Sequence, residues 1–334
     1  MIKYIGSKRR LLPHITQTTC SLPGVRTVAD LFSGTSRVGH ALKAAGLYVK
    51  ANDHAAYAAC LARCHVAADR DAIQSRAERL IAELRRTPPS PGYFTHTFCE
   101  RSRFFHPANG ARIDSIRERI AGLELDDHLE AVALTSLMEA ADRVDSTTGV
   151  QMAYLKQWAP RALKELDLQL PSLLPGPGEA HRLDAADAAS LLTADLAYLD
   201  PPYNQHSYAR NYHIWETLVL WDKPAVYGVA CKREDCRTSS SDFNSRTKAV
   251  GALRRVLDAC EADYLLVSFN DEGHVDRTTM ESLLSRLGSV SVTTIPGRRY
   301  VGAQIGIYNP QGEKVGTVGR LHNNEYLYLV RRST

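Results

Sequence analysis

The stretch LAYLDPPYNQHSYARNYHIWETL, residues 196–218, places a carboxylate, a rigid bend and an aromatic ring at the end of an apolar run. Residues 194–200 have the pattern of a short buried strand that ends at Asp200. Pro201 and Pro202 end the strand, because neither has a backbone N–H to donate to a neighbouring strand. In open α/β sheets, ligands bind beyond the carboxyl ends of the strands. The stretch therefore predicts a ligand-binding edge that displays Asp200 and Tyr203.

The sequence on both sides of this stretch predicts an α/β fold. Near the N-terminus strand and helix patterns alternate, which favours a parallel sheet covered by helices. The alternation stops after residue 68 and resumes at residue 180. The last two strand patterns have no helix between them, which indicates an antiparallel pair at the sheet edge. Strands are predicted at 26–32, 47–53, 194–200, 263–270, 289–296 and 325–332, and helices at 36–46, 55–68, 211–221, 246–261 and 276–288.

A largely helical stretch interrupts the α/β pattern. Helical patterns cover 69–86, 112–120 and 128–144, and the residues that follow continue to 163 before a proline-rich segment. An insertion of this kind usually serves the substrate side of the sheet. It carries many of the arginines that are candidates for contacts with phosphate or base edges. These are Arg76, Arg79, Arg85, Arg86, Arg101, Arg103, Arg112, Arg117 and Arg119, and a basic, glycine-rich hairpin is predicted at 296–320.

The composition limits the class of protein. Hydrophobic residues make up 44% and charged residues 23% of the 334 residues, as in ordinary globular proteins. No apolar run approaches the roughly 18 residues of a membrane span, and the N-terminus lacks the apolar core of a signal peptide. We therefore expect a cytoplasmic protein without a membrane partner. The net charge of +4 is compatible with a polyanionic partner. The seven cysteines are scattered without a paired zinc pattern, so no metal is expected.

The segment ADLFSGTSRVG, residues 29–39, predicts a strand that turns tightly into a helix. Gly34 and Gly39 have the outer spacing of a dinucleotide fingerprint, but Ser36 occupies the middle glycine position. The segment also lacks the Gly-Lys-Ser/Thr of a phosphate-binding loop, which favours a cofactor with an adenosyl or amino-acid group. Asp53 ends the next strand, where an acid can accept hydrogen bonds from ribose hydroxyls.

The Asp-Pro-Pro-Tyr motif suits a planar base that carries an exocyclic amine. The carboxylate of Asp200 and a proline carbonyl can accept the two N–H bonds of the amine, and the ring of Tyr203 can stack on the base. In a nucleic-acid duplex such an amine would be accessible only if the base were flipped out of the helix.

Three motifs in the same order resemble those of the amino-group DNA methyltransferases, particularly the Dam-like adenine-N6 group. They are KYIGSKRRLL (3–12), LFSGTSRVG (31–39) and DPPY (200–203). The segments HPANGARIDSIR and STTGVQMAYLK also resemble a subset of restriction-system adenine methyltransferases. The resemblance implies a Rossmann-like S-adenosylmethionine-binding sheet in residues 1–66 and 180–334, with a helical target-recognition region inserted at 67–179. It further implies duplex DNA as substrate, a bacterial or phage-type protein and a monomer or weak dimer, and it leaves a cognate restriction endonuclease open as a partner.

The resemblance also implies roles for individual residues. The methionine end of the cofactor is expected to lie against Tyr4, Gly6, Ser7, Lys8, Asp30, Phe32 and Gly34, with Lys8 meeting its carboxylate or a neighbouring acid. Ser7 stands where glycine is more usual. Asp53 would bind the ribose and Asp184 the adenine amine of the cofactor, with Asp187 as a nearby competitor. The catalytic pocket would comprise Asp200, Pro201, Pro202 and Tyr203.

The implied reaction is direct transfer of the sulfonium methyl group to adenine N6, without a covalent enzyme intermediate or a metal. Alternatives are the same chemistry on cytosine N4, on an RNA adenine or on a protein glutamine, and a catalytically silent DNA-recognition subunit. Relatives that act on cytosine more often carry serine, and the glutamine enzymes asparagine, where Asp200 stands. The intact Asp200, Lys8 and Asp53 speak against a silent subunit.

Overall fold

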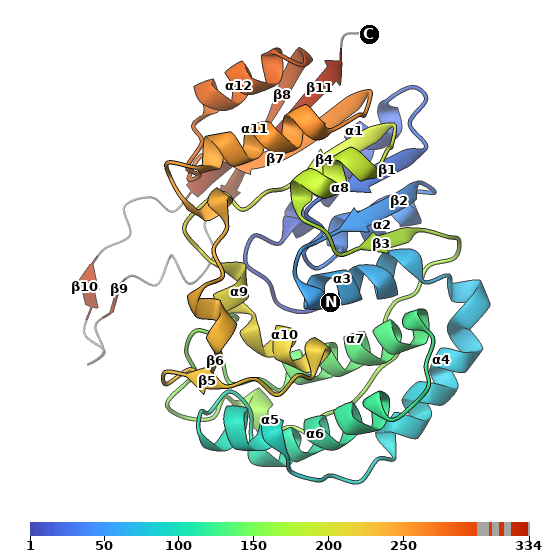
Figure 1. Ribbon diagram of the computed structural model, residues 1–334, viewed down its shortest axis with the longest axis vertical. Coiled ribbons are helices and arrows are strands. Elements are labelled where there is room, and N and C mark those ends of the chain that lie inside the picture. Colours follow the sequence, from blue (N-terminus) through green and yellow to red (C-terminus); the bar gives the residue numbers. More distant parts are fainter. Residues whose placement is uncertain (299–306, 309–313, 317–321, 333–334) are drawn as a thin grey trace.

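The computed structural model describes residues 1–298, 307–308, 314–316 and 322–332 of the chain. Its centre is a seven-stranded sheet in the order β3-β2-β1-β4-β7-β11-β8 (Figure 1). The first five strands in this order pair in parallel, and β11 runs antiparallel to both of its neighbours. The strands are β1 (Thr27–Asp30), β2 (Tyr48–Asn52), β3 (Glu179–His181), β4 (Leu196–Leu199), β7 (Tyr264–Asn270), β8 (Gly288–Arg298) and β11 (His322–Arg332).

This sheet confirms the predicted α/β class and the antiparallel pairing of the last two long strands. The final strand does not extend the edge, however. β11 lies between β7 and β8, so that β8 forms the edge. An antiparallel strand in this position begins where its parallel neighbours end, which brings its first residues to the ligand-binding edge.

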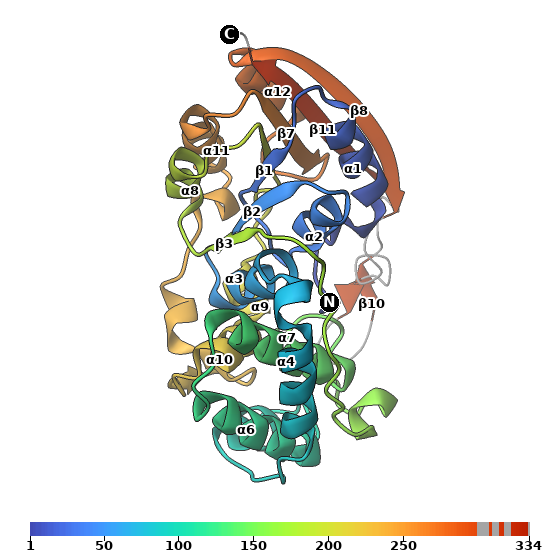
Figure 2. The ribbon, with the colours of Figure 1, turned by 90° about the vertical axis from the view of Figure 1, so that its right-hand side faces the viewer.

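The central parallel strands β1, β4 and β7 are buried on both faces, as is usual in a parallel sheet. Successive residues of each strand point to opposite faces, so Leu196 and Tyr198 join one apolar cluster while Ala197 and Leu199 join another. Helices therefore cover both sides (Figure 2). One face is covered by α1 (Leu12–Ser21) and α2 (Arg37–Ala44), and the other by α8 (Ala185–Leu191), α11 (Ala249–Ala259) and α12 (Arg277–Ser285).

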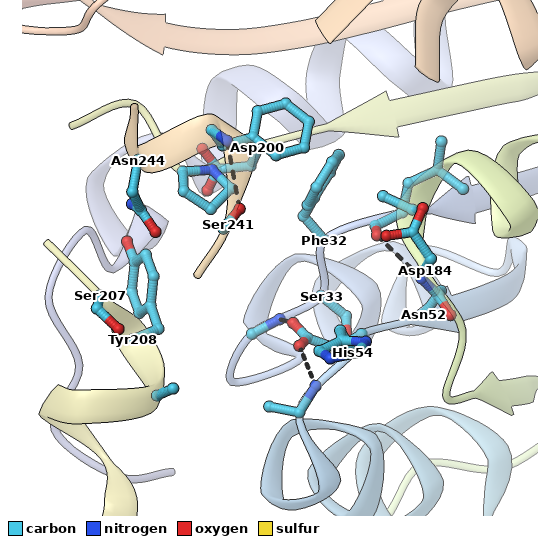
Figure 3. A pocket seen from close by; sticks show the side chains of 18 of the residues that line it. Phe32, Ser33, Asn52, His54, Asp184, Asp200, Ser207, Tyr208, Ser241 and Asn244 are labelled. Atoms are coloured by element: carbon cyan, nitrogen blue, oxygen red, sulfur yellow. Dashed lines mark hydrogen bonds between the residues drawn. The ribbon is translucent and has the colours of Figure 1, made fainter. Parts of the chain in front are cut away.

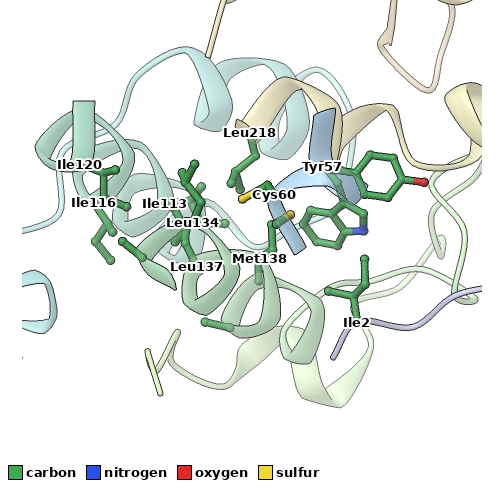
Figure 4. Packing of buried hydrophobic residues seen from close by; sticks show 14 of the residues in the cluster. Ile2, Tyr57, Cys60, Ile113, Ile116, Ile120, Leu134, Leu137, Met138 and Leu218 are labelled. Carbon is green, nitrogen blue, oxygen red and sulfur yellow. The ribbon is translucent and has the colours of Figure 1, made fainter. Parts of the chain in front are cut away.

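A helical layer lies below the carboxyl edge of the sheet in the view of Figure 1. It contains α4 (Arg70–Arg85), α5 (Tyr93–Thr95), α6 (Pro107–Ala121) and α7 (Asp127–Arg143), packed with α3 (Ala56–Ala62) and α10 (His213–Leu220). These helices share one large apolar cluster. Figure 4 shows Ile113, Ile116 and Ile120 of α6 facing α7, with Tyr57 and Leu218 joining from α3 and α10. The same core thus joins the inserted helices to α10, which follows the Asp-Pro-Pro-Tyr segment.

The structure differs from the predicted helices in two places. The segment 146–163 forms an isolated bridge between Thr147 and Tyr154 and a short 3-10 helix, η4 (Pro160–Leu163), because β-branched threonines and Gly149 disfavour a continuous helix. The predicted helix 211–221 corresponds to α10, which begins only at His213, and a separate short helix, α9 (Tyr208–Asn211), precedes it.

Shorter elements complete the chain. They are η1 (Lys8–Arg10), η2 (Arg63–Ala67), η3 (His96–Glu100), β5 (Val226–Tyr227), β6 (Lys232–Arg233), η5 (Glu234–Arg237), η6 (Asp242–Asn244), β9 (Ile307–Tyr308) and β10 (Lys314–Gly316). Most of the basic hairpin predicted at 296–320 lies outside the described residues. Within the described part of the chain, no helix combines the length and the apolar character needed to cross a membrane.

Candidate active site

A cavity of roughly 840 Å³ opens at the carboxyl edge of the sheet, where β1, β2 and β4 end in or next to Asp30, Asp53 and Asp200. In Figure 3, Tyr208 and Asn244 lie on one side of this hollow and Phe32 and Asp184 on the other. The cavity brings together most of the residues expected in the site, and Pro201 and Tyr203 do not line it. The predicted residues that line it are Tyr4, Gly6, Ser7, Lys8, Asp30, Phe32, Gly34, Asp53, Asp184, Asp200 and Pro202.

The glycine loop is shaped by contacts from two other motifs. Gly34 has a φ of +51°, and a Cβ at this position would meet the ring of Tyr4 at 3.3 Å. The backbone N–H of Gly34 donates to Asp53 Oδ2 at 2.9 Å, while Ala55 N–H donates to Oδ1 at 3.0 Å. Asp53 therefore fixes the loop and leaves further lone pairs directed at the cavity.

Tyr4 belongs to a cluster of tyrosines beneath the cavity. Its ring stacks on Tyr208 and Tyr212, with centroid separations of 5.2 and 4.6 Å, and the Tyr212 hydroxyl accepts a 2.6 Å hydrogen bond from the backbone of Ile5. Burial raises the pKa of Tyr4 and Tyr208 well above the usual value, so both hydroxyls stay neutral. The sequence analysis overlooked Tyr208, although the spacing of Tyr208 and Tyr212 directly after the Asp-Pro-Pro-Tyr motif was a visible signal.

Asp30 is the deepest acid of the cavity. It is fully buried, and neither of its carboxylate oxygens has a hydrogen-bond partner among the described residues. Burial raises the pKa of Asp30 to about 8, and the nearby carboxylates of Asp200 and Asp53 add to this shift. The amides of Gly39 and Phe32 oppose the shift without reaching hydrogen-bond geometry. Such a carboxyl group lacks a cationic or donor partner.

Asp200 forms a buried ion pair with Lys8. The Lys8 Nζ lies 3.1 Å from Asp200 Oδ1 and 3.3 Å from Glu325 Oε2, and it lies 5.7 Å from the centroid of the Tyr203 ring. Burial acts to lower the pKa of Lys8, but Asp200 and Glu325 outweigh it and raise the pKa above its usual value. Burial raises the pKa of Asp200 to about 6, against the opposing effect of Lys8.

The loop after Asp200 is held from two sides. His274 N–H donates to the carbonyl of Tyr203 at 2.7 Å, and the Tyr203 ring packs edge-on against Phe269. Asn244 Nδ2 donates to the carbonyls of Asn204 and His206 at 2.6 and 3.1 Å. The serine-rich segment 238–244 thus forms one wall of the cavity, although none of the site residues expected from sequence lies in it.

Two acids compete in the sequence for contact with a cofactor base, and the structure places them differently. Asp184 lines the cavity and caps α8 by accepting a hydrogen bond from Ala186 N–H. Both acids are exposed, but Asp187 is not among the described residues that line the cavity. His213 does not line the cavity: it is buried, its Nε2 donates to the backbone carbonyl of Gln151 at 3.0 Å, and burial lowers its pKa to about 4.

Most of the candidate DNA-binding arginines of the insertion are occupied within the protein. Some form exposed ion pairs, and others donate to backbone carbonyls that helices and loops leave open. Arg76 pairs with Asp126 and Arg119 with Glu83, while Arg85, Arg103, Arg112 and Arg117 donate to carbonyl groups. The sequence cannot distinguish arginines that contact DNA from arginines that bind other parts of the protein, because both kinds occur at the same positions of a helical pattern.

Comparison with known proteins decides the family. The profile of the D12 class N6 adenine-specific DNA methyltransferases matches residues 4–299, which include the N-terminal motif, the glycine loop and the Asp-Pro-Pro-Tyr motif. The chain belongs to this family. It is therefore an adenine-specific DNA methyltransferase, and the alternatives with cytosine, RNA or protein substrates or without activity are not supported.

Curated relatives of this methyltransferase are modification enzymes. The chain is 29% identical to the type II methyltransferase M.NlaIII of Neisseria lactamica over 90% of its own length and 92% of the relative. It is 30% identical to the type II methyltransferase M.FokI of Planomicrobium okeanokoites and 27% identical to the modification methylase StsI of Streptococcus sanguinis. The matches cover 90% of this chain, but only 50% of M.FokI and 49% of StsI.

Proposed function

We propose that the cavity binds S-adenosylmethionine beside an adenine flipped out of duplex DNA, with Asp200 between the two ligands. The observation that carries this proposal is the convergence of Asp30, Asp53 and Asp200 on one cavity at the carboxyl edge of the sheet. The order of the sheet is compatible with a Rossmann-like methyltransferase fold.

The residues present fit this cofactor. S-adenosylmethionine carries an ammonium group and, when bound, supplies a methyl group activated by a positively charged sulfur. The orphaned carboxyl group of Asp30 lacks the cationic partner that an ammonium would provide. Gly6 and Gly34 both have positive φ values, 74° and 51°, and leave room beside Tyr208 and Tyr4 that a side chain would fill. We assign the methionine end to Tyr4, Gly6, Ser7, Asp30, Phe32 and Gly34.

The nucleoside end of the cofactor is assigned to the next two strands. We assign Asp53 to accept hydrogen bonds from the ribose hydroxyls and Asp184 to accept one from the adenine amine. Both carboxylates line the cavity beyond the glycine loop. Lys8 is committed to Asp200 and Glu325, so of the two roles expected for it we favour the neighbouring acid over the cofactor carboxylate.

Asp200 and the carbonyl of Pro201 then accept the two N–H groups of the target amine. These hydrogen bonds favour a pyramidal nitrogen whose lone pair attacks the methyl carbon. The N–C bond forms as the C–S bond breaks, the electron pair of that bond stays on sulfur, and the amine loses its extra proton to water. Positioning supplies most of the rate enhancement. Extrusion of the base costs a few kcal/mol, of which stacking on Tyr203 would return about 1–3 kcal/mol.

The wider assignments rest on the same proposal. Residues 1–66 and 180–334 provide the catalytic part, and 67–179 read the DNA site. A cognate restriction endonuclease is the partner class that the names of the relatives suggest. We further propose that the enzyme acts as a monomer or weak dimer in the cytoplasm of a bacterial or phage-infected cell.

Incubation with methyl-labelled S-adenosylmethionine and duplex DNA tests the proposal. We expect N6-methyladenine as the labelled nucleoside, at one recurring sequence after the modified positions are mapped. Label confined to RNA or protein, or equal labelling of single-stranded DNA of any sequence, would contradict it. Parallel calorimetry with Asp184→Asn and Asp187→Asn separates the two acids, since only Asp184→Asn should weaken cofactor binding.

A further inference from the structure

Glu325 reaches the active site through the topology of the last strand. β11 runs antiparallel between β7 and β8, so its first residues lie at the edge where β7 ends, and Glu325 pairs in register with Asn270. Its side chain lies on the same face of the strand as Leu327, which packs in the apolar cluster with Leu11 and Ile15 of the N-terminal segment. Lys8 precedes those residues, and this shared face brings Glu325 to it.

The contact is a three-membered charge cluster. Lys8, which is only 6% exposed, lies between a carboxylate oxygen of Asp200 at 3.1 Å and one of Glu325 at 3.3 Å. The ring of Tyr203 also faces the ammonium group. Asp30 on β1, Tyr198 on β4 and Tyr208 on α9 face Asp200 from the other sides. No other charged group among the described residues forms an ion pair with Lys8.

The charges in this cluster do not cancel. Two carboxylates share one ammonium group, so one negative charge remains to be satisfied by a ligand. A buried lysine paired with Asp200 alone would direct its hydrogen bonds to the catalytic carboxylate and compete with an incoming amine. In the structure Lys8 Nζ donates a hydrogen bond to Glu325 Oε2, while its contact with Asp200 Oδ1 is an ion pair without hydrogen-bond geometry.

We propose that Glu325 is a positioning residue for methyl transfer, which holds part of the Lys8 ammonium so that Asp200 retains acceptor capacity for the adenine amine. The inference rests on the proposed role of Asp200 and adds a residue from the far end of the chain. It assigns Glu325 no contact with either substrate.

Glu325→Gln separates this role from a structural one. The substitution keeps the shape of the side chain and removes its charge, so Lys8 pairs with Asp200 alone. We expect the single-turnover rate of methyl transfer at saturating ligands to fall about ten-fold, the factor that corresponds to one hydrogen bond with a charged partner. The dissociation constants for cofactor and DNA should remain within about two-fold of the wild-type values, which is the size of effect that surface substitutions usually have.

The pH profile is the readout that a merely structural role would not move. Asp200 must be ionised to accept the amine, so the wild-type rate should fall as the pH drops through about 6. Glu325 contributes to the raised pKa of Asp200. Without its charge the acid limb should move to lower pH. Glu325→Asp keeps the charge one methylene further away, so it should leave the acid limb near wild type and give an intermediate rate.

The control is Glu281→Gln, which removes the same charge from an exposed ion pair with Arg277 on α12. It should behave as wild type. A wild-type rate and acid limb in Glu325→Gln would overturn the inference, as would a defect confined to cofactor or DNA affinity. If Glu325→Gln does not fold, a wild-type rate in Glu325→Asp overturns it. Asp200→Ala in the same assay distinguishes the failures: its normal turnover would refute the proposed pocket itself.

Discussion

Two buried aspartates, one in the helical layer and one at the carboxyl edge of the sheet, differ in their hydrogen-bond partners. Asp114 on α6 is 2% exposed and accepts four hydrogen bonds, from the backbone N–H groups of Gly92, Phe94 and Thr95 and from the Thr95 hydroxyl. Asp30 at the end of β1 is 0% exposed and accepts none among the described residues. Both lie in protein interior, where an unpaired charge is costly.

The difference separates architecture from function. Asp114 fixes the start of α5, whose first N–H groups would otherwise lack partners. Arg117 does the same for the C-terminal end of α10 by donating to the carbonyls of Leu218 and Val219. At the sheet edge, by contrast, acids are brought together without enough partners, and their pKa values rise. Asp114, with four donors, supports the fold, whereas Asp30 has acceptor capacity that a bound cation or donor could satisfy.

Of the substitutions that test this difference, Asp200→Ala should have the largest effect, and the effect should be on the rate of methyl transfer. Loss of the acceptor for the target amine should slow single-turnover methyl transfer by about 10³-fold or more. Stability should change little, because Lys8 keeps Glu325 as a partner. Rapid-quench kinetics with labelled cofactor, together with calorimetric cofactor binding, check this expectation. Normal turnover would remove Asp200 from the mechanism.

Asp114→Ala should produce the opposite result. It leaves three backbone N–H groups and a hydroxyl in the interior without an acceptor, which should cost about 3 kcal/mol of unfolding free energy. The urea midpoint measures this loss. The rate of methyl transfer per folded molecule should stay at the wild-type value. A variant with normal stability and a slower reaction would contradict the assignment of Asp114 to the fold and of the sheet-edge acids to activity.

Asp30→Asn should weaken cofactor binding by about 30-fold, as expected for loss of one hydrogen bond between charged groups. Its effect on stability has a defined sign. Because the folded-state pKa of Asp30 is raised from 3.8 to about 8, this carboxyl group disfavours the folded state increasingly as the pH rises between these values. Asn has no such charge. We therefore expect the ligand-free variant to be more stable than wild type at pH 8–9, as thermal unfolding without cofactor would show.

The smallest effect is expected for Arg119→Ala on the surface of the helical layer. Arg119 donates to Glu83 at 2.6 Å, but both side chains are about half exposed. Solvent screens such a pair, so its removal should cost no more than about 0.5 kcal/mol. Urea unfolding at low and high salt checks the size of the effect. A loss of unfolding free energy as large as that of Asp114→Ala would show that exposed and buried charged groups do not differ in their contribution to stability.

Much of the fold and of the candidate site could be predicted from local pattern. The helices predicted at 69–86 and 128–144 correspond to α4 (Arg70–Arg85) and α7 (Asp127–Arg143), and the predicted strand 263–270 to β7. Helical and strand periodicity are properties of neighbouring residues, which is why they are visible in sequence. In the segment 146–163 the threonines and Gly149 disfavour a helix, but the conformation that the segment adopts depends on distant contacts, such as the hydrogen bond from Gln151 N–H to the carbonyl of Asn211.

The sequence by itself determined that Asp30, Asp53 and Asp200 would meet at one edge, because each ends or follows an apolar strand and parallel strands end on the same side. The order of three motifs implied methyl transfer to an exocyclic amine and favoured adenine N6, which the family match then decided. Only the tertiary structure decided that most arginines of the insertion are occupied within the protein and that Glu325 reaches Lys8 across 317 residues of sequence. The insertion of β11 between β7 and β8 creates that contact, and strand order depends on the packing of the whole sheet and not on the pattern within any one strand.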